Sequence, residues 1–249
     1  MIADSSIWRR PKGPPWADAL RVAGLTFVWL TVLSAASLAC AHGVQGKDAA
    51  FVAASNGPQP IAFLYLGAKH MITGYDHLLF LLGVIFFLRR MKDVAIYVSL
   101  FSLGHSLTLL AGVLGQIHVN PFLVDAVIGL SVAYKAFDNL GGFRTTFGIQ
   151  PDLKLAVLGF GLIHGFGLAT KLQALNLSPD GLLSNMIAFN VGVELGQLLA
   201  LSLILGLVAW WRSRPAFDKQ ATLANGALMS AGFLLVAYQL AGFFRKGAA

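Results

Sequence analysis

Six apolar segments follow one another along the chain, and each is long enough to cross a membrane as a helix. They lie at residues 61–88, 93–115, 121–140, 153–176, 184–211 and 222–244. About 20 helical residues cross the roughly 30 Å hydrocarbon core of a bilayer. The segments lack the polar–apolar alternation of barrel strands, and only helices or closed barrels satisfy their backbone in lipid. We therefore predict an all-α integral membrane protein with a six-helix transmembrane bundle in residues 61–249.

The N-terminal region has the pattern of an export signal. Arg9, Arg10 and Lys12 precede an apolar run at 22–39, and Ala39-Cys40-Ala41 is an A-x-A-like cleavage site. We predict a signal peptide at 1–41, followed by a short periplasmic segment at 42–60. The apolar run is long for a signal peptide, so an uncleaved signal anchor, which would be a seventh helix, is the alternative. Cleavage after Ala41 would leave His42 at the N-terminus, where its imidazole and the α-amine can chelate a divalent ion.

Charge is scarce and unevenly placed. Charged residues make up 12% of the 249 residues and hydrophobic residues 57%, against about 25% charged in soluble domains. The net charge is +7, and basic residues cluster between the apolar segments, which is typical of cytoplasmic loops and not of a nucleic-acid-binding face. We predict a multi-pass protein of the bacterial inner membrane with a periplasmic mature N-terminus. A single cysteine, Cys40, excludes an intrachain disulfide framework and a multi-thiolate metal site.

The first apolar segment contains three ionisable side chains within eight residues, His70, Asp76 and His77. Such a side chain costs about 2.5–3.5 kcal/mol at the centre of a membrane helix on insertion scales, so these three require partners, a wet cavity or a bound cation. His70 and His77 are seven residues apart and share one face of a continuous helix. Asp76 can orient an imidazole or reach a neighbouring helix. Imidazole with carboxylate is a ligand set for nickel, cobalt, zinc or copper.

Four further segments each add polar residues at membrane depth. His105 lies in FSLGHSLTL, and His164 lies between Gly161 and Gly165, whose spacing allows close helix approach. In FNVGVELGQ, the spacing of Asn190, Glu194 and Gln197 predicts one polar stripe that faces the bundle interior. The third segment has Asp125 near its outer end and Lys135 and Asp138 near its inner end, with Lys135 expected to extend to the cytoplasmic surface. The predicted metal residues are His70, Asp76, His77, His105, His164 and Glu194, with His42, Asp125 and Asn190 as further candidates.

Five of these strings resemble the HupE/UreJ family of hydrogenase- and urease-accessory membrane proteins. They are HMITGYDHLLFLLG (70–83), FSLGHSLTL (101–109), the stretch 125–139, GLIHGFGLA (161–169) and FNVGVELGQ (189–197). The resemblance implies a six-helix core after a signal peptide, a nickel or cobalt permease with histidine-rich sites, and metalloenzyme maturation proteins as partners. Two features depart from the family: Asp125 stands where Glu is usual, and the 161–169 string has one histidine where some members have a second and a nearby Glu.

The leading prediction is membrane transport of a divalent transition-metal ion, nickel first, with cobalt, copper or zinc as alternatives. The chain contains no G-x-x-x-x-G-K-[ST] loop for ATP and no H-E-x-x-H string, so we do not expect an enzyme. Two other functions stay open from the sequence. One is a metal-binding accessory protein without transport, and the other is a haem-b electron carrier with paired axial histidines.

Overall fold

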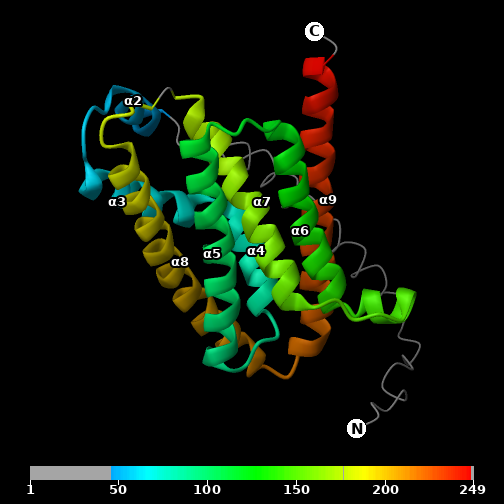
Figure 1. Cartoon of the computed structure of the whole chain (residues 1–249). Helices are drawn as coiled ribbons and strands as arrows, with labels where there is room; N and C mark the ends of the chain where they lie inside the picture. Colours follow the sequence, from blue (N-terminus) through cyan, green and yellow to red (C-terminus); the bar gives the residue numbers. More distant parts are fainter. Residues whose placement is uncertain (1–45, 176, 248–249) are drawn as a thin grey trace.

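The structure is a computed structural model that describes residues 46–175 and 177–247 (Figure 1). These residues form helices and no strand, which confirms the all-α prediction. The helices are α2 (Lys47–Ala54), α3 (Pro60–Thr73), α4 (Tyr75–Ile85), α5 (Met91–Gly115), α6 (Pro121–Asn139), the short π-helix η2 (Phe143–Phe147), α7 (Leu153–Gln173), α8 (Leu182–Arg212) and α9 (Phe217–Gly247). The predicted signal peptide and His42 lie outside the described residues.

Five of the six predicted segments are single helices, α5 to α9, with ends close to the predicted ones. Among the described residues, α5, α7, α8 and α9 are long and apolar enough to cross a membrane by length and composition. The remaining helix of the five, α6, has 19 residues and carries Asp125, Lys135 and Asp138. The total of six crossings stays a prediction.

The first predicted segment is not one helix, and this prediction was wrong. It breaks at Gly74, whose φ of −78° and ψ of 83° leave the helical region. At 1.5 Å per residue, α3 and α4 are about 21 and 16 Å long, so neither crosses the roughly 30 Å core alone. A Cβ atom on Gly74 would lie only 3.0 Å from both the carbonyl oxygen of His70 and Nδ1 of His77. The break therefore favours glycine because the two histidines crowd it.

Glycines bring the helices together in three close pairs, α5 with α7, α3 with α8, and α6 with α9. A Cβ on Gly161 would collide with the backbone of Phe101, and a Cβ on Gly165 would collide with the carbonyl oxygen of His105. The predicted close approach at Gly161 and Gly165 is confirmed. It holds the backbones of α5 and α7 against each other at the level of His105 and His164.

The connections divide between the two ends of the bundle. The three basic connections, α4–α5, α6–α7 and α8–α9, lie at the lower end in Figure 1, and the C-terminal end of α9 lies at the upper end. At the lower end, the guanidinium of Arg212 donates to the carbonyl oxygens of Leu88 (2.6 Å) and Ile85 (3.0 Å). It thereby binds the C-terminal end of α4, where free carbonyls favour a cation.

The lower half also contains a buried polar group that we call the Lys135 cluster, made of Lys135, Asp138, Asn139 and Asn225. Lys135 does not extend to the surface as predicted but is 4% exposed. Its ammonium donates to Asp138 and Asn139, both at 2.6 Å. The Asn139 amide in turn donates to Asn225 and to the carbonyl oxygen of Gly83, both at 2.8 Å. Lys135 is buried because its partners lie three and four residues along its own helix, within reach of its side chain.

Candidate metal centre

Four histidines from four helices meet inside the bundle. His70 lies in the last turn of α3, His77 in the first turn of α4, His105 in the middle of α5 and His164 in the middle of α7. Their exposed fractions are between 1% and 7%. The Gly74 break and the α5–α7 glycine contacts thus position four imidazoles in one buried region.

His77 is at the centre of the group. Its ring centroid lies 5.3 Å from that of His70, 5.6 Å from that of His105 and 4.9 Å from that of His164. One nitrogen from each of His70, His77 and His105 lies within 4.8 Å of the other two. Nitrogens bound to one tetrahedral ion at about 2.0–2.1 Å lie about 3.4 Å apart. Small side-chain rotations would therefore bring three imidazoles to ligand distance.

His70 and His77 meet across the helix break and not through the helical register that the sequence suggested. Seven residues on a continuous helix rise about 10 Å, so a shared face would have placed the two imidazoles two turns apart. The non-helical ψ of Gly74 instead turns α4 relative to α3. Their ring centroids come within 5.3 Å as a result.

Two of the imidazoles are oriented by hydrogen bonds from Nδ1. Oδ1 of Asp76 accepts hydrogen bonds from Nδ1–H of His77 (2.7 Å) and from the backbone N–H of the same residue (2.6 Å). Nδ1–H of His164 donates to the carbonyl oxygen of Phe160 at 2.7 Å. Ionised carboxylates and carbonyls only accept hydrogen bonds, so both contacts place the proton on Nδ1. Asp76 therefore orients the His77 imidazole, and metal-binding histidines are commonly oriented by such a partner.

His105 is the most isolated polar group of the centre. It is 1% exposed, and neither of its ring nitrogens has a hydrogen-bond partner in the part of the chain that the structure describes. The ring stacks on Phe101 with centroids 6.2 Å apart. Most buried polar groups have a partner, and burying one without a partner is unfavourable. A lone pair left in this way suits a bound cation.

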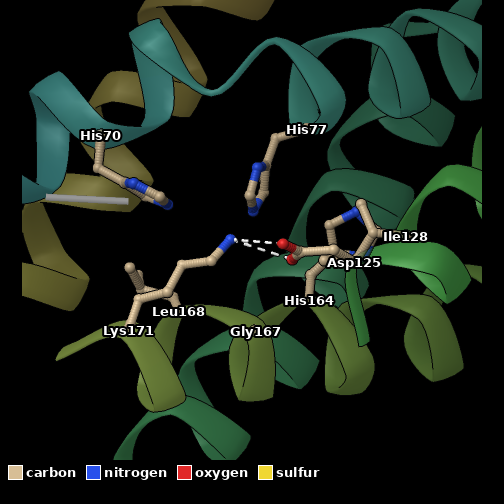
Figure 2. Close-up of a pocket in the computed structure, with 8 residues that line it drawn as sticks. All are labelled: His70, His77, Asp125, Ile128, His164, Gly167, Leu168 and Lys171. Atoms are coloured by element: carbon tan, nitrogen blue, oxygen red, sulfur yellow. Dashed lines mark hydrogen bonds and ion pairs between the residues drawn. The ribbon is translucent and has the colours of Figure 1, made fainter. Parts of the chain in front are cut away.

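The pocket beside the histidines has a charged mouth (Figure 2). Its empty volume is about 200 Å³, and the lining residues are His70, His77, Asp125, Ile128, His164, Gly167, Leu168 and Lys171. The ammonium of Lys171 donates to both carboxylate oxygens of Asp125, at 3.0 and 2.9 Å. These two side chains are 21% and 13% exposed, more than the histidines behind them. Sequence reasoning missed Lys171, although it lies seven residues after His164 and hence on the same face of α7.

The sequence profile of the HupE / UreJ protein family matches residues 46–247. The chain belongs to this family. Membership confirms the resemblance seen in the five sequence strings and agrees with a multi-pass membrane protein. The HupE/UreJ family implies an accessory or permease-like role in nickel or cobalt handling, and it is not a known enzyme family. No curated protein and no solved structure matches the chain.

Of the residues that the HupE/UreJ resemblance implies as functional, Glu194 is the one that lies away from the centre. Its side chain is exposed, whereas Asn190 and Gln197 are buried, so the prediction of one interior stripe on α8 was wrong for Glu194. The helix buries the face that packs on α3 and α5, where Ser102 donates to the Gln197 side chain at 3.0 Å. Glu194 lies beyond the edge of that face. Asn190 is 7% exposed and has no side-chain hydrogen-bond partner among the described residues, but it does not line the pocket.

Proposed function

We propose that this protein transports a divalent transition-metal ion, with Ni²⁺ as the first candidate, through the group of His70, His77, His105 and His164. We call this group the histidine centre. The observation that carries the proposal is the convergence of four buried imidazoles around His77, at a break between two half-length helices. The ion would exchange its water for the nitrogens of His70, His77, His105 and His164.

The donor set suits passage of an ion. Imidazole and carboxylate ligands serve nickel, cobalt, zinc and copper, and the residues that the structure describes include no cysteine that would hold a soft ion tightly. Asp76 supports the central imidazole from behind through a 2.7 Å hydrogen bond. The HupE/UreJ family context favours nickel or cobalt within this group of metals.

The helix break supports transport over storage. In many secondary transporters, discontinuous helices form the substrate site near the middle of the membrane, and one group of helices moves against another around that site. Here His70 ends one half-helix, His77 begins the other, and only Gly74 separates α3 from α4. A change at Gly74 would separate the two imidazoles and release the ion.

A haem-b carrier is a poorer fit to the same histidines. Pockets that hold even drug-sized ligands measure about 300–1,000 Å³, whereas this pocket has at most about 200 Å³ of empty space even when open solvent at its mouth is included. Phe101 fills the space next to three of the imidazoles, with centroid distances of 5.0 to 6.2 Å. We expect the purified protein to show no Soret band.

For orientation, we propose that the end with the three basic connections faces the cytoplasm of a bacterial inner membrane. The predicted periplasmic end then contains the start of α6 and the end of α7, and with them Asp125 and Lys171 at the pocket mouth. An ion from the periplasm would reach this mouth first. Metalloenzyme maturation proteins, which the family resemblance implies as partners, would collect the ion at the opposite end.

The experiment is ⁶³Ni²⁺ uptake into sealed proteoliposomes that contain the full chain, compared with His77→Ala and Glu194→Gln. We expect uptake by the parent and by Glu194→Gln, and none above protein-free vesicles by His77→Ala. Binding by the purified parent without flux into vesicles would identify a non-transporting accessory protein instead. Equal flux for His77→Ala and the parent would remove the histidine centre from the pathway.

A further inference from the structure

The ammonium of Lys171 lies in the same pocket as the candidate metal ligands. Figure 2 shows it pointing into the space that the His70 and His77 rings also face, with Asp125 on its other side. Its hydrogen bonds to the two oxygens of Asp125 measure 3.0 and 2.9 Å. Lys171 comes from α7 and Asp125 from α6, so the pair closes the pocket between two helices.

This position is in conflict with a bound metal ion. An ammonium has three donors and no lone pair, so it cannot be a ligand. Two cations in a partly buried pocket repel each other strongly, because the surroundings screen them less than water does. Asp125 supplies the carboxylate among the pocket-lining residues, and Lys171 holds both of its oxygens.

We propose that Lys171 is a tethered competitor of the metal ion. This inference rests on the proposed function of the histidine centre. Without metal, the ammonium neutralises Asp125 and stands in for the absent cation. An arriving divalent ion takes over Asp125, and the Lys171 side chain, which is 21% exposed, moves outward, away from the histidines. When the ion leaves for the cytoplasm, Lys171 returns, so the competitor limits affinity and assists release.

A purely structural ion pair makes a different prediction. If Lys171 and Asp125 serve only to hold α6 against α7, removing the ammonium loosens the pocket and weakens metal binding. If Lys171 competes with the ion, removing the ammonium strengthens binding. The sign of the change in affinity therefore separates the two roles.

The experiment is calorimetric titration of the purified full chain in detergent with Ni²⁺ alone. The variants are Lys171→Met, His77→Ala and the control Lys154→Met, which removes an exposed lysine from the first turn of the same helix. We expect Lys171→Met to bind Ni²⁺ at least tenfold more tightly than the parent, and Lys154→Met to bind like the parent. Unchanged or weaker binding by Lys171→Met, with binding lost in His77→Ala, would overturn the competitor and leave the proposed function intact. No Ni²⁺ binding by the parent itself would contradict both the competition by Lys171 and the proposed function.

A double variant that also changes Asp125 provides a second test. In the double variant Lys171→Met with Asp125→Asn, we expect the tenfold gain to disappear, because the gain requires the released carboxylate. Retention of the full gain without Asp125 would contradict the exchange.

A measurement on the parent protein avoids any dependence on how the variants fold. Amine-reactive labelling read by mass spectrometry should increase at Lys171 at least threefold when Ni²⁺ is added, while labelling at Lys154 stays constant. Equal labelling of Lys171 with and without saturating Ni²⁺ would overturn the proposal.

Discussion

The histidine centre and the Lys135 cluster are both buried polar groups in one bundle, but they differ in how their atoms are satisfied. Each member of the Lys135 cluster has a hydrogen-bond partner within it or in the adjacent backbone. In the histidine centre, both ring nitrogens of His105 have none within the described residues. Buried polarity alone therefore does not indicate function. The first group satisfies itself and joins helices, whereas the second contains a buried imidazole whose nitrogens have no hydrogen-bond partner among the described residues.

Helix α6 contributes to the Lys135 cluster and, through Asp125, to the pocket beside the histidine centre. Lys135 is neutralised by Asp138, three residues away on its own helix, so this pair is local. Asp125 is neutralised by Lys171, 46 residues away on another helix, so this pair depends on how α6 and α7 meet. The local pair can persist through a helix movement, but the pair at the pocket mouth is able to open with one.

His77→Ala should have the largest effect and should act on binding. The central imidazole touches the other three rings, so we expect Ni²⁺ binding to fall at least a hundredfold with the helical content unchanged. Equilibrium dialysis with circular dichroism measures both quantities. The control is His118→Ala, which removes an exposed histidine, and a similar loss in that variant would refute the assignment.

Asp138→Ala should act in the opposite way, on stability and not on binding. It leaves the buried Lys135 without its carboxylate, and removing one partner of a buried pair costs about 3–5 kcal/mol. We expect a lower unfolding temperature in detergent, measured by intrinsic fluorescence. In the folded fraction, Ni²⁺ affinity should stay within about twofold of the parent. A large loss of affinity with no loss of stability would make the Lys135 cluster part of the metal path.

Asp76→Asn tests the support behind His77. The variant keeps the shape of the side chain but removes the charge that fixes the imidazole, and loss of such a partner typically lowers metal affinity about 10–100-fold. Calorimetry with Ni²⁺ checks this. Affinity equal to that of the parent would show that the 2.7 Å hydrogen bond does not tune the site.

Gly165→Ala should move α5 away from α7 and weaken both stability and binding. The added Cβ would collide with the carbonyl oxygen of His105, and such overpacking costs about 1–3 kcal/mol. Gly159→Ala on the same helix is the matched control, because a Cβ there has nothing within 4 Å. Thermal unfolding of the two variants compares them directly, and equal behaviour would contradict the close contact.

Glu194→Gln should have the smallest effect. Its exposed side chain lies off the buried face of α8, so we expect Ni²⁺ affinity and uptake within twofold of the parent. A tenfold loss of Ni²⁺ affinity would show that Glu194 contributes to the metal site.

The sequence predicted the helical bundle well, because five long apolar runs match five helices with ends that agree within five residues. It also identified His70, His77, His105 and His164 as candidate metal residues, since polar groups in a bilayer avoid lipid, and the structure brings these four together. It did not predict the break at Gly74, because a single glycine in an apolar run is equally typical of an intact helix. What distinguishes this glycine is the crowding by His70 and His77 on either side.

The remaining differences come from contacts between distant parts of the chain. Helical periodicity placed Asn190, Glu194 and Gln197 on one side of α8, but the limit of the buried face depends on where α3 and α5 pack. The sequence did not predict a role for Lys171 because its partner, Asp125, is 46 residues earlier. Spacing along one helix does not reveal such a pair.

X-ray absorption of the Ni²⁺-loaded protein tests the central claim most directly. We predict a first shell of nitrogen and oxygen that includes at least three imidazoles, and the loss of one imidazole in His105→Ala. A first shell of oxygen alone, or an imidazole count unchanged in His105→Ala, would contradict the histidine centre.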